Sequence, residues 1–210
     1  MTSHQFAVTL LALFVAEAWG HGMVMDPPNR SSLWRFDPDA PINYNDNENF
    51  CGGYSTQWLV NNGSCGVCGD DVRLDRPRPN ENTGTYGQGK ISATYEAGSV
   101  ITVKVLITAN HWGYFNFSIC NIITPDEPET VGCFEQIPLA DGKLSYYLPS
   151  RDKGYYNVDL QLPAAFTCEQ CVLRWHWNTG NTWGLCEDGS SDIGCGPQET
   201  FMSCSDIAIV

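Results

Sequence analysis

Val100-Ile101-Thr102-Val103-Lys104-Val105-Leu106-Ile107 is the stretch that decides the fold class of this chain. It follows the turn signal Gly98-Ser99 and is rich in β-branched residues, which is typical of a β-strand. Five further strand-like runs come after it, at 114–119, 144–148, 156–162, 172–177 and 201–209. Short strands separated by Gly, Pro and Asn turns predict an all-β protein, an antiparallel β-sandwich.

The run at 172–177 shows most clearly which side of a strand faces the core. It alternates, so that Leu173, Trp175 and Trp177 share one face while Arg174 and His176 share the other. We therefore expect the two tryptophans to be buried between sheets.

The segment from Asp26 to about Asn82 differs from the strand-rich remainder. It is rich in Pro, Gly and Asn, and only Ser55 to Val60 suggests a short helix. Loops of this length are usually functional or pinned by disulfides. Both are expected here, because three cysteines lie inside the segment: Cys51, Cys65 and Cys68.

Residues 1–20 have the pattern of a secretory signal peptide. The apolar run from Phe6 to Ala16 is too short to span a bilayer, and Ala18-Trp19-Gly20 places small residues at the two positions that a signal peptidase reads. Cleavage after Gly20 would leave residues 21–210 as one secreted, monomeric domain with no membrane anchor.

Ten cysteines, all after residue 20, predict five disulfides in a secreted chain. Two Cys-x-x-Cys motifs, Cys65/Cys68 and Cys168/Cys171, also permit a zinc ribbon, which an oxidising export route makes the less favoured alternative. The pairing stays open at this stage. Three sequons, at Asn29, Asn62 and Asn116, permit N-glycosylation, least of all at Asn116 within a strand-like run.

The charge balance restricts the partners. The chain has 11 Lys and Arg against 24 Asp and Glu, a formal net charge of −13. Such a chain repels polyphosphate, so nucleic acid is not an expected partner. A neutral polymer, or one with a few cationic groups, remains compatible.

Two histidines carry the expected chemistry. Cleavage after Gly20 frees an α-amine on His21, which can then offer a metal that amine and its ring Nδ1. His111 lies between two predicted strands, with Ala109 and Gly113 nearby leaving space for an ion. One amine and two imidazoles make a three-nitrogen site, which copper binds most tightly among divalent first-row metals. His176 is the rival second ligand, but it shares a sheet face with Arg174 and favours a structural role.

Three stretches taken in order resemble the lytic polysaccharide monooxygenases, most closely auxiliary activity family fifteen. They are His21-Gly22-Met23-Val24 with Pro28 and Arg30, Thr108-Ala109-Asn110-His111 with Gly113 and Phe115, and 198–207. The resemblance implies an immunoglobulin-like or fibronectin-III-like β-sandwich with copper on a flat face. It implies oxidative cleavage of crystalline chitin first and cellulose second, with an external electron donor and dioxygen or hydrogen peroxide.

The resemblance also implies residue roles. His21 would supply its amine and Nδ1 and His111 one ring nitrogen, usually Nε2, which together form a histidine brace. Phe201 would shield the axial side of the copper without bonding to it. Glu199 shares the strand face of Phe201 and would hydrogen-bond near the oxygen site. Aromatic candidates for substrate contact are Tyr44, Tyr54, Trp58 and Trp112.

Two other functions fit parts of the pattern. A secreted protein could bind copper through the same brace without cleaving polysaccharide. A carbohydrate-binding module without metal would not need a free His21. A hydrolase is disfavoured, because no two carboxylates are paired in sequence as acid and base.

Overall fold

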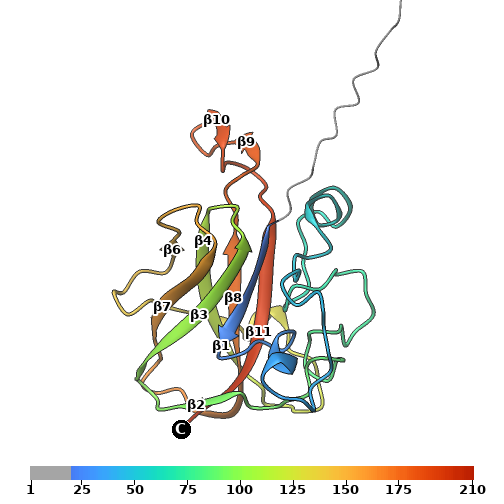
Figure 1. Cartoon of the computed structure of the whole chain (residues 1–210), viewed down its shortest axis with the longest axis vertical. Helices are drawn as coiled ribbons and strands as arrows, with labels where there is room; N and C mark the ends of the chain where they lie inside the picture. Colours follow the sequence, from blue (N-terminus) through green and yellow to red (C-terminus); the bar gives the residue numbers. More distant parts are fainter. Residues whose placement is uncertain (1–19) are drawn as a thin grey trace, which may run out of the picture.

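The computed structural model describes residues 20–210 and consists of two β-sheets packed against each other (Figure 1). The smaller sheet has the order β1 (His21–Asp26), β3 (Val100–Ala109), β7 (Gly154–Gln161). The larger has the order β2 (Ala93–Tyr95), β11 (Thr200–Ile209), β8 (Cys168–Asn178), β4 (Tyr114–Asn121), β5 (Glu135–Ile137), and β6 (Tyr146–Tyr147) pairs with β4. Only β2 and β11 run parallel among the described strand pairs. The all-β sandwich is confirmed.

The core between the sheets follows the predicted alternation. In β3, Ile101, Val103, Val105 and Ile107 are buried while the intervening residues face outward or are partly covered. From the other sheet come Phe115 and Phe117 of β4, Leu173, Trp175 and Trp177 of β8, and Phe201 of β11. The predicted strands are all present, although the run at 144–148 is reduced to the two residues of β6.

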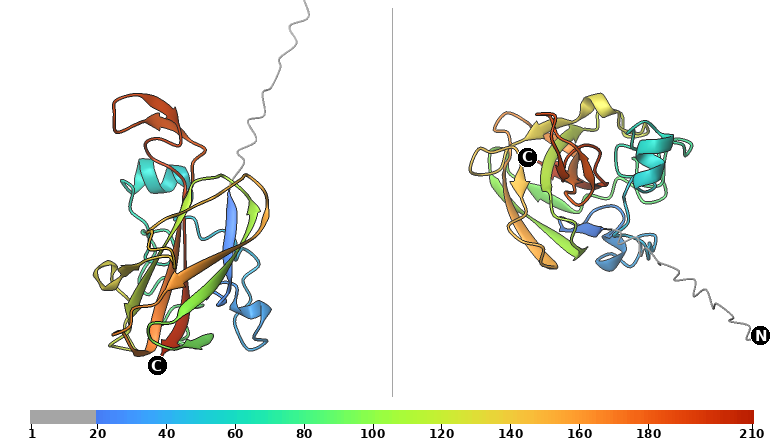
Figure 2. Two further views of the ribbon diagram at one scale, coloured as in Figure 1. Left: turned by 90° about the vertical axis from the view of Figure 1, so that its left-hand side faces the viewer. Right: turned by 90° about the horizontal axis from the view of Figure 1, so that it is seen from above.

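Three short helical turns and one hairpin lie outside the sandwich. The turns are η1 (Leu33–Arg35), η2 (Thr56–Val60), which confirms the short helix expected there, and η3 (Val131–Cys133). The hairpin joins β9 (Trp183–Leu185) to β10 (Ser191–Ile193) and stands at the end of the sandwich where β1 begins. The hairpin and η2 both lie at this end in a second view (Figure 2).

All ten cysteines are paired in disulfides, as the even count predicted. The Cys65/Cys68 motif is split, because Cys65 bonds Cys51 while Cys68 bonds Cys204 on β11. The zinc-ribbon alternative is therefore excluded. The remaining pairs are Cys120–Cys133, Cys168–Cys171 and Cys186–Cys195. The Cys51–Cys65 bond thus closes the long loop on itself, and the Cys68–Cys204 bond fixes it to the sheet.

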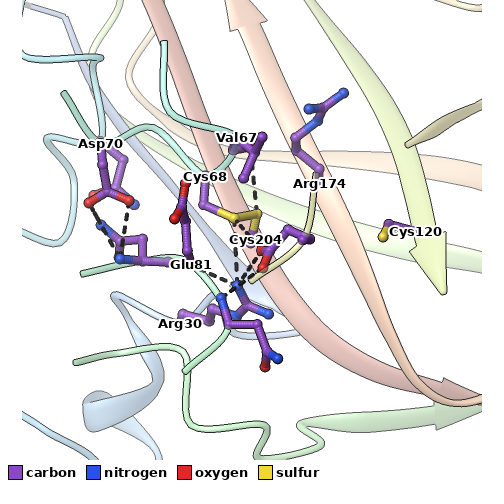
Figure 3. The surroundings of a disulfide bond; sticks show 12 residues. Arg30, Val67, Cys68, Asp70, Glu81, Cys120, Arg174 and Cys204 are labelled. Atoms are coloured by element: carbon purple, nitrogen blue, oxygen red, sulfur yellow. Dashed lines mark hydrogen bonds and ion pairs between the residues drawn. A yellow bond between two sulfur atoms is a disulfide. The ribbon is translucent and has the colours of Figure 1, made fainter. Parts of the chain in front are cut away.

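A buried ionic cluster surrounds the Cys68–Cys204 disulfide (Figure 3). Arg30 is 3% exposed and donates two hydrogen bonds to Asp206, at 2.8 and 2.7 Å, and one to Glu129 at 2.6 Å. Burial alone would lower the pKa of Arg30, but the two carboxylates raise it by more than burial lowers it. The guanidinium therefore stays charged. Arg30 therefore joins the loop after β1, the segment around Glu129, and β11.

The three sequons have very different environments. Asn29 is fully buried, and its amide donates to the Val24 carbonyl and accepts from the Ser32 N–H, so the folded protein does not offer it for modification. Asn116 is half-buried within β4. Asn62 is exposed on a turn with φ of 50°. Among the three sequons, Asn62 is thus the one whose side chain is accessible for glycosylation in the folded chain.

The predicted signal peptide, apart from Gly20, lies outside the described residues. Within residues 20–210, no helix has both the length and the apolar character needed to cross a membrane.

Candidate metal centre

His21 opens β1 and is held by its neighbours on both sides. It pairs with Ala109 of β3, and its carbonyl accepts a hydrogen bond from Thr108 Oγ1 at 3.3 Å. The next residue, Gly22, packs so closely on the core that a Cβ there would lie 2.6 Å from Ile107 Cδ1. On the His21 ring, Nε2 lies 3.2 Å from Glu48 Oε1. The start of β1, at His21, is therefore fixed to the sheet rather than free.

His111 lies on the loop between β3 and β4, which backbone contacts to the end of β8 hold in place. Its carbonyl accepts from Gly180 N–H, and the next carbonyl, of Trp112, accepts from the Trp177 indole at 2.6 Å. Gly113 follows with φ of 88°, and a Cβ there would lie 2.0 Å from the Asn178 carbonyl oxygen. Only glycine permits this turn, and the turn brings His111 to the rim of the sandwich.

The four predicted site residues converge around Gly20. A Cβ built on Gly20 would lie 3.0 Å from His111 Nδ1, 3.0 Å from Phe201 Cε2 and 3.1 Å from a Glu199 carboxylate oxygen. The Gly20 N–H donates to the same carboxylate at 3.2 Å. Residue 20 therefore lies between His111, Phe201 and Glu199, immediately before His21.

Glu199 and Phe201 take the orientations that strand alternation predicted. Glu199 Oε2 lies 2.9 Å from His111 Nδ1, and the fully buried Phe201 ring stacks on Trp177 with centroids 5.0 Å apart. Gln198 points away and binds the hairpin through Thr182, accepting from its N–H and donating to its carbonyl, both at 2.9 Å. The two residues that lead into β11 thus face different ways, Glu199 toward the site and Gln198 toward the hairpin.

The nitrogen of His111 that faces Gly20 is Nδ1, whereas the family resemblance implies Nε2. Here Nδ1 lies 2.9 Å from the Glu199 carboxylate and 3.0 Å from the Asn181 amide nitrogen. These two polar groups account for the orientation of the ring in a chain that still carries Gly20.

The donor set fits a copper ion. Cutting the bond between Gly20 and His21 would free the amine of His21, beside the space that residue 20 now occupies next to His111 and Glu199. With His21 Nε2 against Glu48, its Nδ1 stays available beside that amine. Three neutral nitrogens suit copper, and the buried Phe201 ring offers no competing ligand.

A recess of about 390 Å³ opens beside His111. His111, Glu199, Asn181 and Thr182 line it together with the stretch from Gly52 to Thr56 of the long loop. The long loop therefore contributes directly to the surroundings of the metal centre.

His176 lies away from this site, on the outer face of β8. It pairs with Met202 and Asn116, and it lines a shallow depression with Arg174. The structure thus gives His176 the position on a sheet face that its alternation indicated.

The environment of His176 predicts a pH effect on stability. Burial, and then the charge of Arg174, lower its pKa from 6.5 to about 4. Between these values the unfolded chain binds a proton that the folded chain does not, so stability falls as pH decreases through this window. Urea unfolding measures the free energy of unfolding at pH 7 and at pH 4.5. The loss of this free energy between the two pH values should be smaller for His176→Gln than for the unmodified protein, by more than about 1 kcal/mol. Equal losses would contradict the assignment.

The aromatic candidates for substrate contact are not all equivalent. Tyr54 lines the recess, and the Trp58 indole is tied to the Gln198 carbonyl at 2.8 Å. Tyr44 is 79% exposed and packs edge-on against Trp34. Trp112 is 42% exposed, next to His111, with the Arg151 guanidinium over its ring.

Sequence reasoning missed Glu48, Asn181 and Trp183. Glu48 lies in a polar run between Asn47 and Asn49, and nothing in that run indicates a contact with His21. Asn181 follows Gly180 in a turn, which would read as an ordinary loop. The exposed Trp183, two residues later, carried a weak signal as an aromatic residue among turn residues.

Comparison with known proteins shows the family of this chain. A family model described as "Lytic polysaccharide mono-oxygenase, cellulose-degrading" matches residues 21–207, beginning at His21. The comparison with curated proteins gives no match. The fold, the histidine pair and this match define a copper-dependent oxidoreductase, a lytic polysaccharide monooxygenase.

Two solved structures refine the assignment. The family-fifteen enzyme from Thermobia domestica, solved in the Cu(I) state, is 48% identical with a TM-score of 0.87, covering 90% of this chain and 98% of that one. The chain belongs to the lytic polysaccharide monooxygenases, within auxiliary activity family fifteen. The cellulose-active enzyme CelS2, solved with copper, has a TM-score of 0.51 and 19% identity over 90% of this chain and 98% of that one, and shows the shared fold. The cofactor is one copper ion.

Proposed function

We propose that residues 1–20 are removed as a signal peptide and that residues 21–210 form one secreted, monomeric copper monooxygenase domain. The position of Gly20 among His111, Phe201 and Glu199 carries this proposal, because cleavage there creates a metal-binding amine next to the second histidine. Five disulfides fit an oxidising, extracellular setting.

Each residue of the site has a proposed task. His21, through its amine and Nδ1, and His111, through one ring nitrogen, would hold the copper. Bound copper supplies the oxidising chemistry needed to break a C–H bond beside a glycosidic oxygen, which no side chain supplies. Phe201, whose buried ring offers no ligand atom, would keep water and polar ligands away from its side of the ion. Glu199, next to His111, would hold a hydrogen bond near the oxygen site.

The proposed substrate is crystalline chitin, with cellulose second. Electrons would come from an external small-molecule or protein donor, and the oxidant would be dioxygen or hydrogen peroxide. The order of preference rests on the substrate range that the family resemblance implies. The net charge of −13 is compatible with both polymers.

The hairpin supplies an apolar face for such a polymer. Trp183 and Ile193 lie directly opposite each other, and Leu185 is two residues from Trp183, so the three side chains share one face. They are 64%, 54% and 66% exposed respectively. Gln198 and the Cys186–Cys195 bond fix the hairpin next to Asn181, which contacts His111. Sugar rings have apolar faces that stack on such aromatic surfaces.

The test of this proposal is a product analysis. Copper-loaded protein beginning at His21 should release oligosaccharides with aldonic-acid or ketone masses from crystalline chitin, less from cellulose, and only with ascorbate. His111→Ala is the matched negative. Tight copper binding without oxidised products from either polymer would favour the alternative, a secreted copper-binding protein that does not cleave polysaccharide. Greater release from cellulose would reverse the substrate order.

A further inference from the structure

The contact between Glu48 and His21 suggests a role that the proposed brace leaves open. Glu48 Oε1 lies 3.2 Å from His21 Nε2, the ring nitrogen on the side away from the backbone. A carboxylate is an acceptor only, so it selects the form of the ring that carries its hydrogen on Nε2. The lone pair is then on Nδ1, the nitrogen that can close a chelate ring with the α-amine.

The loop that carries Glu48 is itself held against the start of β1. The Asn47 carbonyl accepts from Gly22 N–H at 3.1 Å, and the Asn47 amide donates to Thr108 Oγ1, which donates to the His21 carbonyl. On the other side of Glu48, the Asn49 carbonyl accepts from Met202 N–H on β11. Two strands therefore fix the loop on either side of Glu48.

The His21–Glu48 pair is partly buried, which strengthens the electrostatic interaction between the two side chains. The side chains of His21 and Glu48 are 25% and 33% exposed, so solvent screens the carboxylate less than on an open surface. The negative charge of Glu48, in contact with Nε2, increases electron density on Nδ1 of the same ring. It therefore stabilises Cu(II) more than Cu(I), and it restricts rotation of the ring.

We propose that Glu48 is a positioning residue for the metal centre, which fixes the tautomer and orientation of His21 and makes its Nδ1 a stronger ligand. This inference rests on the proposed function, in that His21 is a copper ligand. It assigns to the long loop, through residues 47–49, a direct influence on the copper beyond its contribution to the neighbouring recess.

The test compares Glu48→Gln with the unmodified protein, both beginning at His21 and loaded with copper. Glu48→Gln keeps the size of the side chain and removes its charge. We expect Cu(II) affinity to fall by roughly tenfold, the copper reduction potential to rise, and the Cu(II) electron paramagnetic resonance spectrum to change. Glu48→Asp retains the charge, so its reduction potential should lie between those of Glu48→Gln and the unmodified protein. The control is Glu96→Gln, which makes the same change in net charge at an exposed carboxylate next to Ala97, whose N–H donates to the Val210 carbonyl.

The outcomes separate this inference from the proposed function. If unmodified protein beginning at His21 fails to bind copper, the brace itself is wrong. If it binds copper and Glu48→Gln has the same affinity, potential and spectrum, the role of Glu48 is overturned. A loss of affinity with an unchanged potential and spectrum would also overturn it, because that result would show only a loosened loop.

Discussion

Protein that retains Gly20 in front of His21 is expected to bind Cu(II) at least about a hundredfold more weakly than protein that begins at His21, a difference of about 2.7 kcal/mol or more. The retained peptide bond turns the α-amine into an amide, which does not bind copper as a neutral donor. Gly20 also occupies the approach to the second ligand, since its N–H donates to Glu199 and a Cβ on it would lie 3.0 Å from His111 Nδ1 and from Phe201 Cε2. Isothermal titration with Cu(II) measures both forms directly.

The matched control adds one glycine at the opposite end of the chain, after the exposed Val210. The C-terminus lies at the far end of the sandwich from the start of β1 (Figure 1), so this addition should leave affinity unchanged. Equal affinities of the Gly20-retaining and His21-initiated proteins would rule out the amine as a ligand. They would leave two imidazoles at most, and the monooxygenase mechanism would need another third donor.

The sequence predicted the strands whose burial follows a regular alternation. β3 shows it from Val100 to Thr108 and β8 from Leu173 to Asn178, because one face packs on the core and the other does not. β1 was missed as a strand, since Gly22, Met23 and Val24 are buried in succession and give no period of two. The strands β2, β5, β9 and β10 have three residues each and depend on their partners rather than on a local pattern.

The histidines, Glu199 and Phe201 were predicted through family resemblance together with strand alternation. Glu48 and Asn181 were not, because their contacts with the histidines span 27 and 70 residues and no local pattern encodes them. The disulfides show the same division. Their number follows from composition, but the bond from Cys68 to Cys204 joins residues 136 positions apart and depends on the folded arrangement.

Replacing Arg30 should have the largest effect on stability. We expect Arg30→Met to lower the free energy of unfolding by about 3–5 kcal/mol, because it leaves the carboxylates of Asp206 and Glu129 buried without their cation. Their side chains are 3% and 0% exposed, so water cannot replace the guanidinium. Guanidinium chloride unfolding at pH 7 with the disulfides intact gives the measurement. The control is Arg73→Met, since Arg73 pairs with Asp71 at the surface, and its loss should be under about 1 kcal/mol.

A second variant distinguishes charge from geometry in this cluster. Arg30→Lys keeps the positive charge but replaces a planar fork, which bonds both Asp206 oxygens and one Glu129 oxygen, by a single ammonium. An ammonium cannot reproduce that bidentate contact, so Arg30→Lys should lose more than half of the stability lost by Arg30→Met. Near-complete recovery with lysine would show that charge neutralisation alone is enough. Equal, small losses in Arg30→Met and Arg73→Met would show that the cluster around the Cys68–Cys204 bond contributes little to stability.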